Sequence, residues 1–147
     1  MRDGSTSAFL VVMRLAFTLL LPLLVISCAA HSGADDSPSP VADELRAAGL
    51  AMADRGEVEQ PFLAVKGRVY EVDGGDLQLY SYPSEEAAKA DAAKISPDGE
   101  ISMVQVHWMA PPHFYRRGST LAIYVGTAPG ALTPLEQVLG VPFAVHR

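Results

Sequence analysis

The residue types best suited to chemistry are concentrated in one stretch, residues 107–118, which reads HWMAPPHFYRRG. It contains two of the four histidines, His107 and His113, and the single tryptophan. Aromatic rings provide rigid contact area, and paired arginines grip carboxylate or phosphate groups. The candidate binding loop consists of Trp108, His113, Phe114, Tyr115, Arg116 and Arg117. The competing interpretation is a long hairpin connection whose prolines stiffen the turn and whose aromatic side chains cover one end of the core.

The two histidines of this stretch also raise the question of a metal site or an enzyme. His107 and His113 are six residues apart, so they supply at most half of a tetrahedral site, and spacing fixes no acidic residue beside them. The chain has no nucleophile elbow, HExxH motif or phosphate-binding glycine loop. We therefore expect no enzymatic activity, no metal and no cofactor. A small hydrolase or metal-binding protein that uses His107 and His113 stays open as the alternative.

The single cysteine, Cys28, closes an apolar segment near the start of the chain. Residues 15–26 read LAFTLLLPLLVI without a charge, and Arg14 precedes them. This run is shorter than the ~20 apolar residues of a membrane-spanning helix, and it fits the apolar part of a secretory signal. Residues 25–28 (VISC) resemble the bacterial lipobox. We expect cleavage between Ser27 and Cys28, with lipid attached to the Cys28 thiol.

Composition agrees with a separate N-terminal segment. The first 27 residues include 17 apolar ones, whereas the whole chain is 49% hydrophobic. Removal of residues 1–27 takes away two bases and one acid, so the formal charge changes from −6 to −7. An acidic domain lacks the basic face that nucleic acid requires, so we expect no nucleic acid as a partner. An anionic bilayer also repels an acidic domain, so acyl chains must hold the domain at a membrane. Translation from Met13 would give a compact signal, so we predict that residues 1–12 are dispensable.

Three segments follow from these observations. Residues 1–27 are the predicted signal peptide, residues 28–39 the lipidated cysteine and a flexible linker rich in small and polar residues, and residues 40–147 a folded domain. We expect the protein in the cell envelope, anchored to a membrane by its lipid. In a host with two membranes we expect the outer membrane, facing the periplasm, because Ala29 rather than an acidic residue follows the cysteine.

Two helices are predicted in the first half of the domain. Ser39 followed by proline begins an apolar stripe, which predicts a helix over 40–54 that ends near Gly56. Ser84 is the predicted N-cap of the second helix, whose inner face is rich in alanine. The turn at residues 96–99 ends it.

A third helix is predicted from the capping box TPLE, with Thr133 as N-cap and Gly140 at its end. Residues 58–65 are apolar but interrupted by Pro61, so they form at most an edge strand or a loop. The glycines of residues 73–76 (DGGD) permit the tight turn of a hairpin. The predicted strands are 68–73, 76–82, 101–109 and 119–126.

The order of elements is therefore helix, two strands, helix, two strands, helix. Short connections favour an antiparallel sheet of about four to five strands with three helices mainly on one face, an α+β domain. Tyr70, Tyr80 and Tyr82 could form an exposed aromatic face, although such tyrosines more often bury the ring and leave the hydroxyl in water. An apolar patch on a sheet face left free by the helices would instead indicate a structural envelope protein.

Residues 62–143 resemble a group of small bacterial lipoproteins with an uncharacterised C-terminal domain. The runs that carry the resemblance are residues 67–70, 77–80, 95–99, 112–118, 124–126 and 139–140. The resemblance implies no activity and no catalytic residues. We expect a lipid-anchored, non-catalytic binding or assembly module, with the membrane and an envelope protein as candidate partners. The alternative is a small envelope hydrolase or metal-binding protein that uses His107 and His113.

Overall fold

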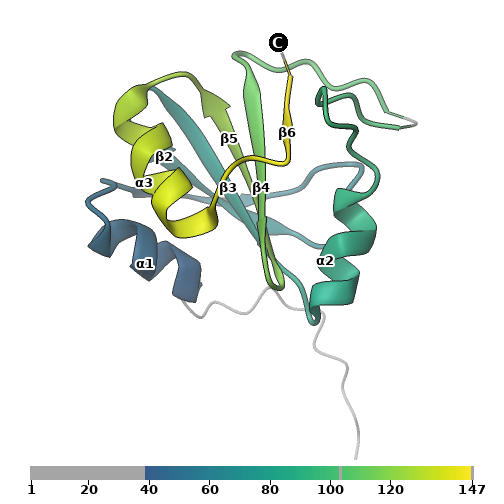
Figure 1. Ribbon diagram of the computed structural model, residues 1–147, viewed down its shortest axis with the longest axis horizontal. Helices are drawn as coiled ribbons and strands as arrows, with labels where there is room; N and C mark the ends of the chain where they lie inside the picture. Colours follow the sequence, from purple (N-terminus) through teal and green to yellow (C-terminus); the bar gives the residue numbers. More distant parts are fainter. Residues whose placement is uncertain (1–38, 103, 147) are drawn as a thin grey trace, which may run out of the picture. The chain divides into compact units, whose positions relative to one another are not determined.

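The computed structural model describes residues 39–102 and 104–146, so the predicted signal peptide, Cys28 and most of the predicted linker lie outside the described residues. The described residues form a six-stranded antiparallel sheet in the order β1-β2-β3-β5-β4-β6, with helices on both faces (Figure 1). The strands are β1 (Ala53–Val58), β2 (Gly67–Val72), β3 (Gly75–Ser81), β4 (Pro112–Arg117), β5 (Thr120–Gly126) and β6 (Ala144–Val145). The helices are α1 (Pro40–Ala47), α2 (Glu85–Ala92) and α3 (Pro129–Leu139). The predicted α+β class is confirmed.

The central strands separate two hydrophobic cores. Alternate residues such as Leu79 and Tyr124 pack with α1 and α3, and their neighbours such as Tyr80 and Ile123 pack with α2. Figure 1 shows α1 and α3 on one side of the sheet and α2 on the other. Two of the three helices share a face, as predicted, and α2 covers the second one. The free apolar face that a structural envelope protein would present is therefore not found on the described part of the sheet.

Helix α1 is shorter than the predicted 40–54. Gly49 adopts a φ of 93°, and its N–H donates to the Arg46 carbonyl at 3.0 Å. The Leu50 N–H donates to the Leu45 carbonyl at 3.0 Å, and both leucines are buried in the same core. These two bonds form the glycine-dependent C-terminal cap of a helix. The predicted end near Gly56 is wrong because Gly49 already provides the left-handed residue that such a cap requires.

Strand β1 occupies part of the predicted helix and forms one edge of the sheet. Its pairing with β2 is interrupted by a bulge between Asp54 and Gly56, where Gly56 has a φ of 103° and donates its N–H to Asp54 Oδ1 at 2.7 Å. Across the pair, Arg68 Nη2 lies 2.7 Å from Asp54 Oδ2, and Arg55 pairs with Glu71. The edge is therefore charged and bent.

Several local predictions are confirmed. Strands β2 and β3 form the hairpin, with Gly74 at a φ of 67° in its turn. Ser84 caps α2, because its Oγ accepts the Ala87 N–H at 3.1 Å. In β5, Leu121 and Val125 pack with α2, while Ala122 faces the other core, as the alternation predicts.

The segment before β5 differs from the prediction. The predicted strand over 101–109 is wrong: after an isolated bridge between Ile95 and Ile101, the described residues run without regular structure to Ala110. The strand is β4 instead, in the stretch where a loop was predicted. Pro112 is tolerated there because it is the first residue of the strand, where a missing N–H costs little.

Helix α3 begins at Pro129, four residues before the predicted N-cap. Pro129 takes the first helical position, where its fixed φ is favourable. The predicted capping box thus lies inside the helix, and Pro134 is a buried internal residue. The predicted end is confirmed, with Gly140 at a φ of 84°. Among the described residues, no helix is both long and apolar enough to cross a bilayer.

Candidate functional site

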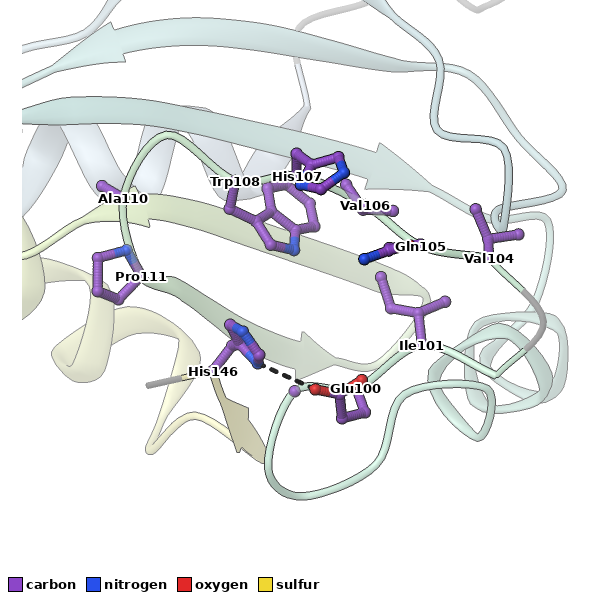
Figure 2. A pocket seen from close by; sticks show the side chains of 11 residues that line it. Glu100, Ile101, Val104, Gln105, Val106, His107, Trp108, Ala110, Pro111 and His146 are labelled. Atoms are coloured by element: carbon purple, nitrogen blue, oxygen red, sulfur yellow. Dashed lines mark ion pairs between the residues drawn. The ribbon is translucent and has the colours of Figure 1, made fainter.

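A pocket of about 430 Å³ opens between His146 and the stretches 99–101 and 104–111 (Figure 2). It lies on the α2 side of the sheet, because the Trp108 ring packs edge to face against Phe114, which belongs to the core under α2 (ring centres 5.9 Å apart). The side chains that line it include Glu100, Ile101, Gln105, His107, Trp108 and His146.

A tight turn positions the acidic side of the pocket. The Gly99 N–H donates to the Ser96 carbonyl at 2.9 Å, and the Ser96 N–H donates to the Glu100 carbonyl at 2.9 Å. Gly99 has a φ of 80°, and a Cβ there would lie 2.6 Å from Cβ of His146. Glycine is therefore required both for the turn and for the close approach of the two segments. The sequence predicts this turn but not its contact with His146.

His146 lies at the junction of the two segments. Its Nδ1 is 3.8 Å from Glu100 Oε1 and 3.3 Å from the Asp98 carbonyl oxygen, and its backbone N–H donates to the Pro112 carbonyl at 3.1 Å. Hydrogen bonding from the Ser96 hydroxyl is the main cause of a lowered pKa at Asp98. A second hollow of about 580 Å³ shares Glu100 and His146 with the first pocket. His146 is thus accessible from two sides.

Trp108 forms the opposite side of the pocket. The ring is half-buried, and its packing against Phe114 fixes its orientation. In Figure 2 the indole nitrogen lies on the side of the ring that faces Gln105 and His146. Among the described residues no hydrogen bond to this nitrogen is found. Trp108 is the one member of the predicted binding loop that contributes to the pocket.

The remaining residues of the predicted loop belong to the sheet. Phe114 and Tyr115 are fully buried on opposite faces of β4. Arg116 Nη1 lies 3.4 Å from Glu85 Oε1 of α2, whereas Arg117 pairs with Glu44 of α1. The two arginines therefore point to opposite sides and each joins β4 to a helix. The prediction that this segment is a loop is wrong, and so is the idea that the two arginines grip one anion.

The two candidate metal-binding histidines are not brought together. His107 lines the pocket on the α2 side. The His113 ring lies 5.9 Å from the Tyr124 ring, in contact with the core under α1 and α3. Its buried Nδ1 and the Tyr115 hydroxyl have no hydrogen-bond partner among the described residues. The part of the chain that the structure describes contains no group of three or more His, Cys, Asp or Glu residues that could hold a metal.

The tyrosines form no exposed face. Tyr70, Tyr80 and Tyr82 are all buried, so the favoured expectation of buried rings is confirmed and the possibility of an exposed aromatic face is excluded. The expectation that the hydroxyl groups stay in water is wrong for Tyr80 and Tyr82, which donate to Gln78 and Asp91. Burial raises the pKa of Tyr80 and of Tyr82 above the ordinary value, and in Tyr82 the bond to Asp91 raises the pKa further. These hydroxyls stay protonated and act as hydrogen-bond donors.

A buried polar cluster centred on Asp91 was not anticipated from the sequence. The Asp91 carboxylate accepts the Ala64 N–H at 2.6 Å, the Tyr82 hydroxyl at 2.9 Å and the Lys94 ammonium at 2.5 Å. Lys94 also donates to the Phe62 carbonyl at 3.0 Å. The cluster fastens the segment before β2 to α2, so its groups are already occupied. One feature of the sequence does point to this cluster. Asp91 lies three residues after Ala88, so an acidic side chain occupies the buried face of the helix.

No protein-family model, curated protein or solved structure matches the chain, so the resemblance to small bacterial lipoproteins stays a prediction.

Proposed function

We propose that the protein is a lipid-anchored binding module of the cell envelope, without catalytic activity of its own. The observation that carries this proposal is the position of Cys28, the only cysteine, directly after the uncharged apolar run 15–26 and within the sequence VISC. A thiol at this place is the acceptor for a diacylglycerol group, and two or three acyl chains give stable anchoring where a single chain does not.

The chemistry of the folded part supports binding rather than catalysis. Its pocket combines one half-buried tryptophan with exposed Gln105, His107 and Glu100, a mixture that suits recognition of a small polar ligand. The contacts of His146 are a carbonyl oxygen and the Glu100 carboxylate. The rival function, a hydrolase or metal-binding protein that uses His107 and His113, lacks support from the geometry, because these side chains lie on different faces of the sheet.

Metabolic labelling with radioactive palmitate tests the anchor. The full chain should incorporate label and sediment with membranes, and Cys28→Ala should do neither. Ser37→Ala changes a small polar residue in the same predicted linker, so it serves as the matched control and should be labelled like the original chain. Equal labelling of the Cys28→Ala variant would overturn the proposal.

A further inference from the structure

The charges that line the pocket exclude one broad class of ligand. Among the described residues that line it, Glu100 is the one acidic side chain, His107 and His146 are the basic groups, and none is lysine or arginine. Phosphate and carboxylate ligands are held by guanidinium or ammonium groups through charge-assisted hydrogen bonds. An anion would instead meet the Glu100 carboxylate. The pocket is therefore suited to a neutral or a cationic ligand.

The aromatic content of the pocket favours a neutral ligand over a quaternary ammonium ion. Recognition of a quaternary ammonium ion uses a cage of several aromatic faces around the cation. The described residues of the lining include one large aromatic ring, that of Trp108, which packs edge to face on Phe114 and stays half-exposed. A single fixed ring is a flat apolar surface with a polar N–H at its edge. Such a surface fits the C–H face of a sugar ring, whose hydroxyl groups project around the rim.

The other polar groups match those hydroxyl groups. The Gln105 amide and the His107 imidazole each offer a donor and an acceptor, the Glu100 carboxylate accepts, and the Trp108 indole donates. A sugar hydroxyl both donates and accepts, so it can pair with any of these groups. Figure 2 shows Gln105, Trp108 and His146 around one space, with Glu100 at its lower side. A volume of about 430 Å³ lies in the range of small-ligand pockets.

From these observations we propose that the pocket between Trp108 and His146 is a binding site for a neutral saccharide. The assignment rests on the proposed binding function and names its ligand class. The sugar ring packs on the Trp108 indole, and its hydroxyl groups bind Gln105, His107 and Glu100. The site requires no metal and no covalent step.

Fluorescence provides a direct test, because Trp108 is the only tryptophan of the chain and its emission reports on the pocket alone. The full lipidated chain is purified in a polyoxyethylene detergent, which carries no sugar headgroup. It is then titrated with glucose, galactose, N-acetylglucosamine and the disaccharide of N-acetylglucosamine. We expect a saturable change in emission with at least one of these probes. Gln105→Ala and Glu100→Ala should each weaken binding about tenfold, since each removes one hydrogen-bonding group.

The variants are matched by a neighbouring control. Met109→Ala changes a fully exposed side chain beside Trp108 that does not line the pocket, so binding should be unchanged. Gln105 and Glu100 are exposed, and far-UV circular dichroism checks that their variants fold. The proposal is overturned if no sugar gives a saturable change, if Met109→Ala weakens binding as much as Gln105→Ala, or if only tetramethylammonium or inorganic phosphate binds.

Failure of this proposal is distinguishable from failure of the proposed function. The palmitate label of the same preparation reports on Cys28, which lies outside the described domain. A labelled protein that binds none of the sugars defeats the pocket assignment and leaves the anchor standing. A protein that binds a sugar but carries no label defeats the anchor and leaves the pocket assignment standing.

Discussion

Replacing Asp91 by asparagine removes a buried charge without changing the size of the side chain. The carboxylate has an exposed fraction of only 6% and accepts three hydrogen bonds, from the Ala64 N–H, the Tyr82 hydroxyl and the Lys94 ammonium. An asparagine amide offers one acceptor oxygen, and its NH₂ group is itself a donor. The Ala64 N–H and the Tyr82 hydroxyl both donate to Oδ2, whereas Lys94 donates to Oδ1. An amide oxygen placed at Oδ2 therefore turns the buried NH₂ group toward the Lys94 ammonium, where this new donor has no acceptor.

The expected loss of stability follows from these contacts. A buried donor left without an acceptor costs about 1–3 kcal/mol. The ion pair adds less than about 1 kcal/mol, because the Lys94 side chain is 45% exposed and water screens its charge. We expect Asp91→Asn to lower the free energy of unfolding by about 1–4 kcal/mol at neutral pH. This is a large part of the ~5–15 kcal/mol that holds a domain of ordinary stability together.

The effect of this replacement should depend on pH. Burial opposes ionisation of Asp91, but the hydrogen bonds from Lys94, Ala64 and Tyr82 outweigh it and lower the pKa below the ordinary value of 3.8. A carboxyl with a lowered pKa in the folded state stabilises the fold fully above the unfolded-state pKa and loses this contribution as the pH falls through the folded-state pKa. The difference between the original chain and Asp91→Asn should therefore be full at pH 7 and shrink as the pH falls below about 4.

Urea unfolding followed by far-UV circular dichroism measures both quantities. The control is Asp43→Asn, which breaks an ion pair between two exposed side chains on α1 and should change the free energy of unfolding by less than about 0.5 kcal/mol. If Asp91→Asn is no less stable than Asp43→Asn at pH 7, Asp91 does not hold the segment before β2 to α2, and the reasoning from its contacts fails.

Two further predictions concern β2 and β4. Gly67→Ala should lower the free energy of unfolding by about 1–3 kcal/mol in urea titrations. The new Cβ would lie 2.6 Å from the Leu79 carbonyl oxygen and 2.7 Å from the Tyr80 ring, so unchanged stability would contradict this packing. Arg116→Ala and Arg117→Ala should each cost less than about 1 kcal/mol, and their effects should add in the double variant, because their partners lie on opposite faces of the sheet. A coupling above about 0.5 kcal/mol would indicate that the two side chains share a site.

The sequence predicted best those elements whose signals are local. Ser84 could be identified as a cap because its hydroxyl binds an N–H three residues away, and the hairpin turn at Gly74 depends only on its own backbone. The strand β5 was predictable because one set of alternate residues is aliphatic throughout. In each case the residues that form the structure are neighbours in the chain.

Strand β4 shows why other elements could not be predicted. In a sheet with one buried face, apolar and polar residues alternate along each strand. In a sheet that is covered on both faces, successive residues of a strand are buried. Phe114 and Tyr115 are both fully buried because α2 covers one face and α1 with α3 the other. Without this knowledge, a proline followed by adjacent aromatic residues and arginines resembles an exposed loop. The prolines and a place between two predicted strands therefore favoured a loop at residues 112–117, where helices on both faces of the sheet produce a strand.

The candidate pocket depended on tertiary contacts in the same way. Trp108 was identified from its residue type, but Glu100 and His146 are 46 residues apart and meet only because Gly99 lets the two segments approach. Helix α1 illustrates a different difficulty, since Gly49 and Gly56 both lie within or just after the predicted helix and both have a positive φ. One ends a helix and the other forms a bulge, and only the pairing of β1 with β2 distinguishes them.

The charged, bulged strand β1 also limits self-association. An open strand edge can pair with the same edge of a second copy and begin an aggregate. If two copies paired antiparallel about the middle of β1, Asp54 of each would lie opposite Glu57 of the other, so that like charges would face each other. The bulge at Gly56 would also break the run of backbone hydrogen bonds. The β1 edge is therefore a poor template for pairing with a second copy of the chain.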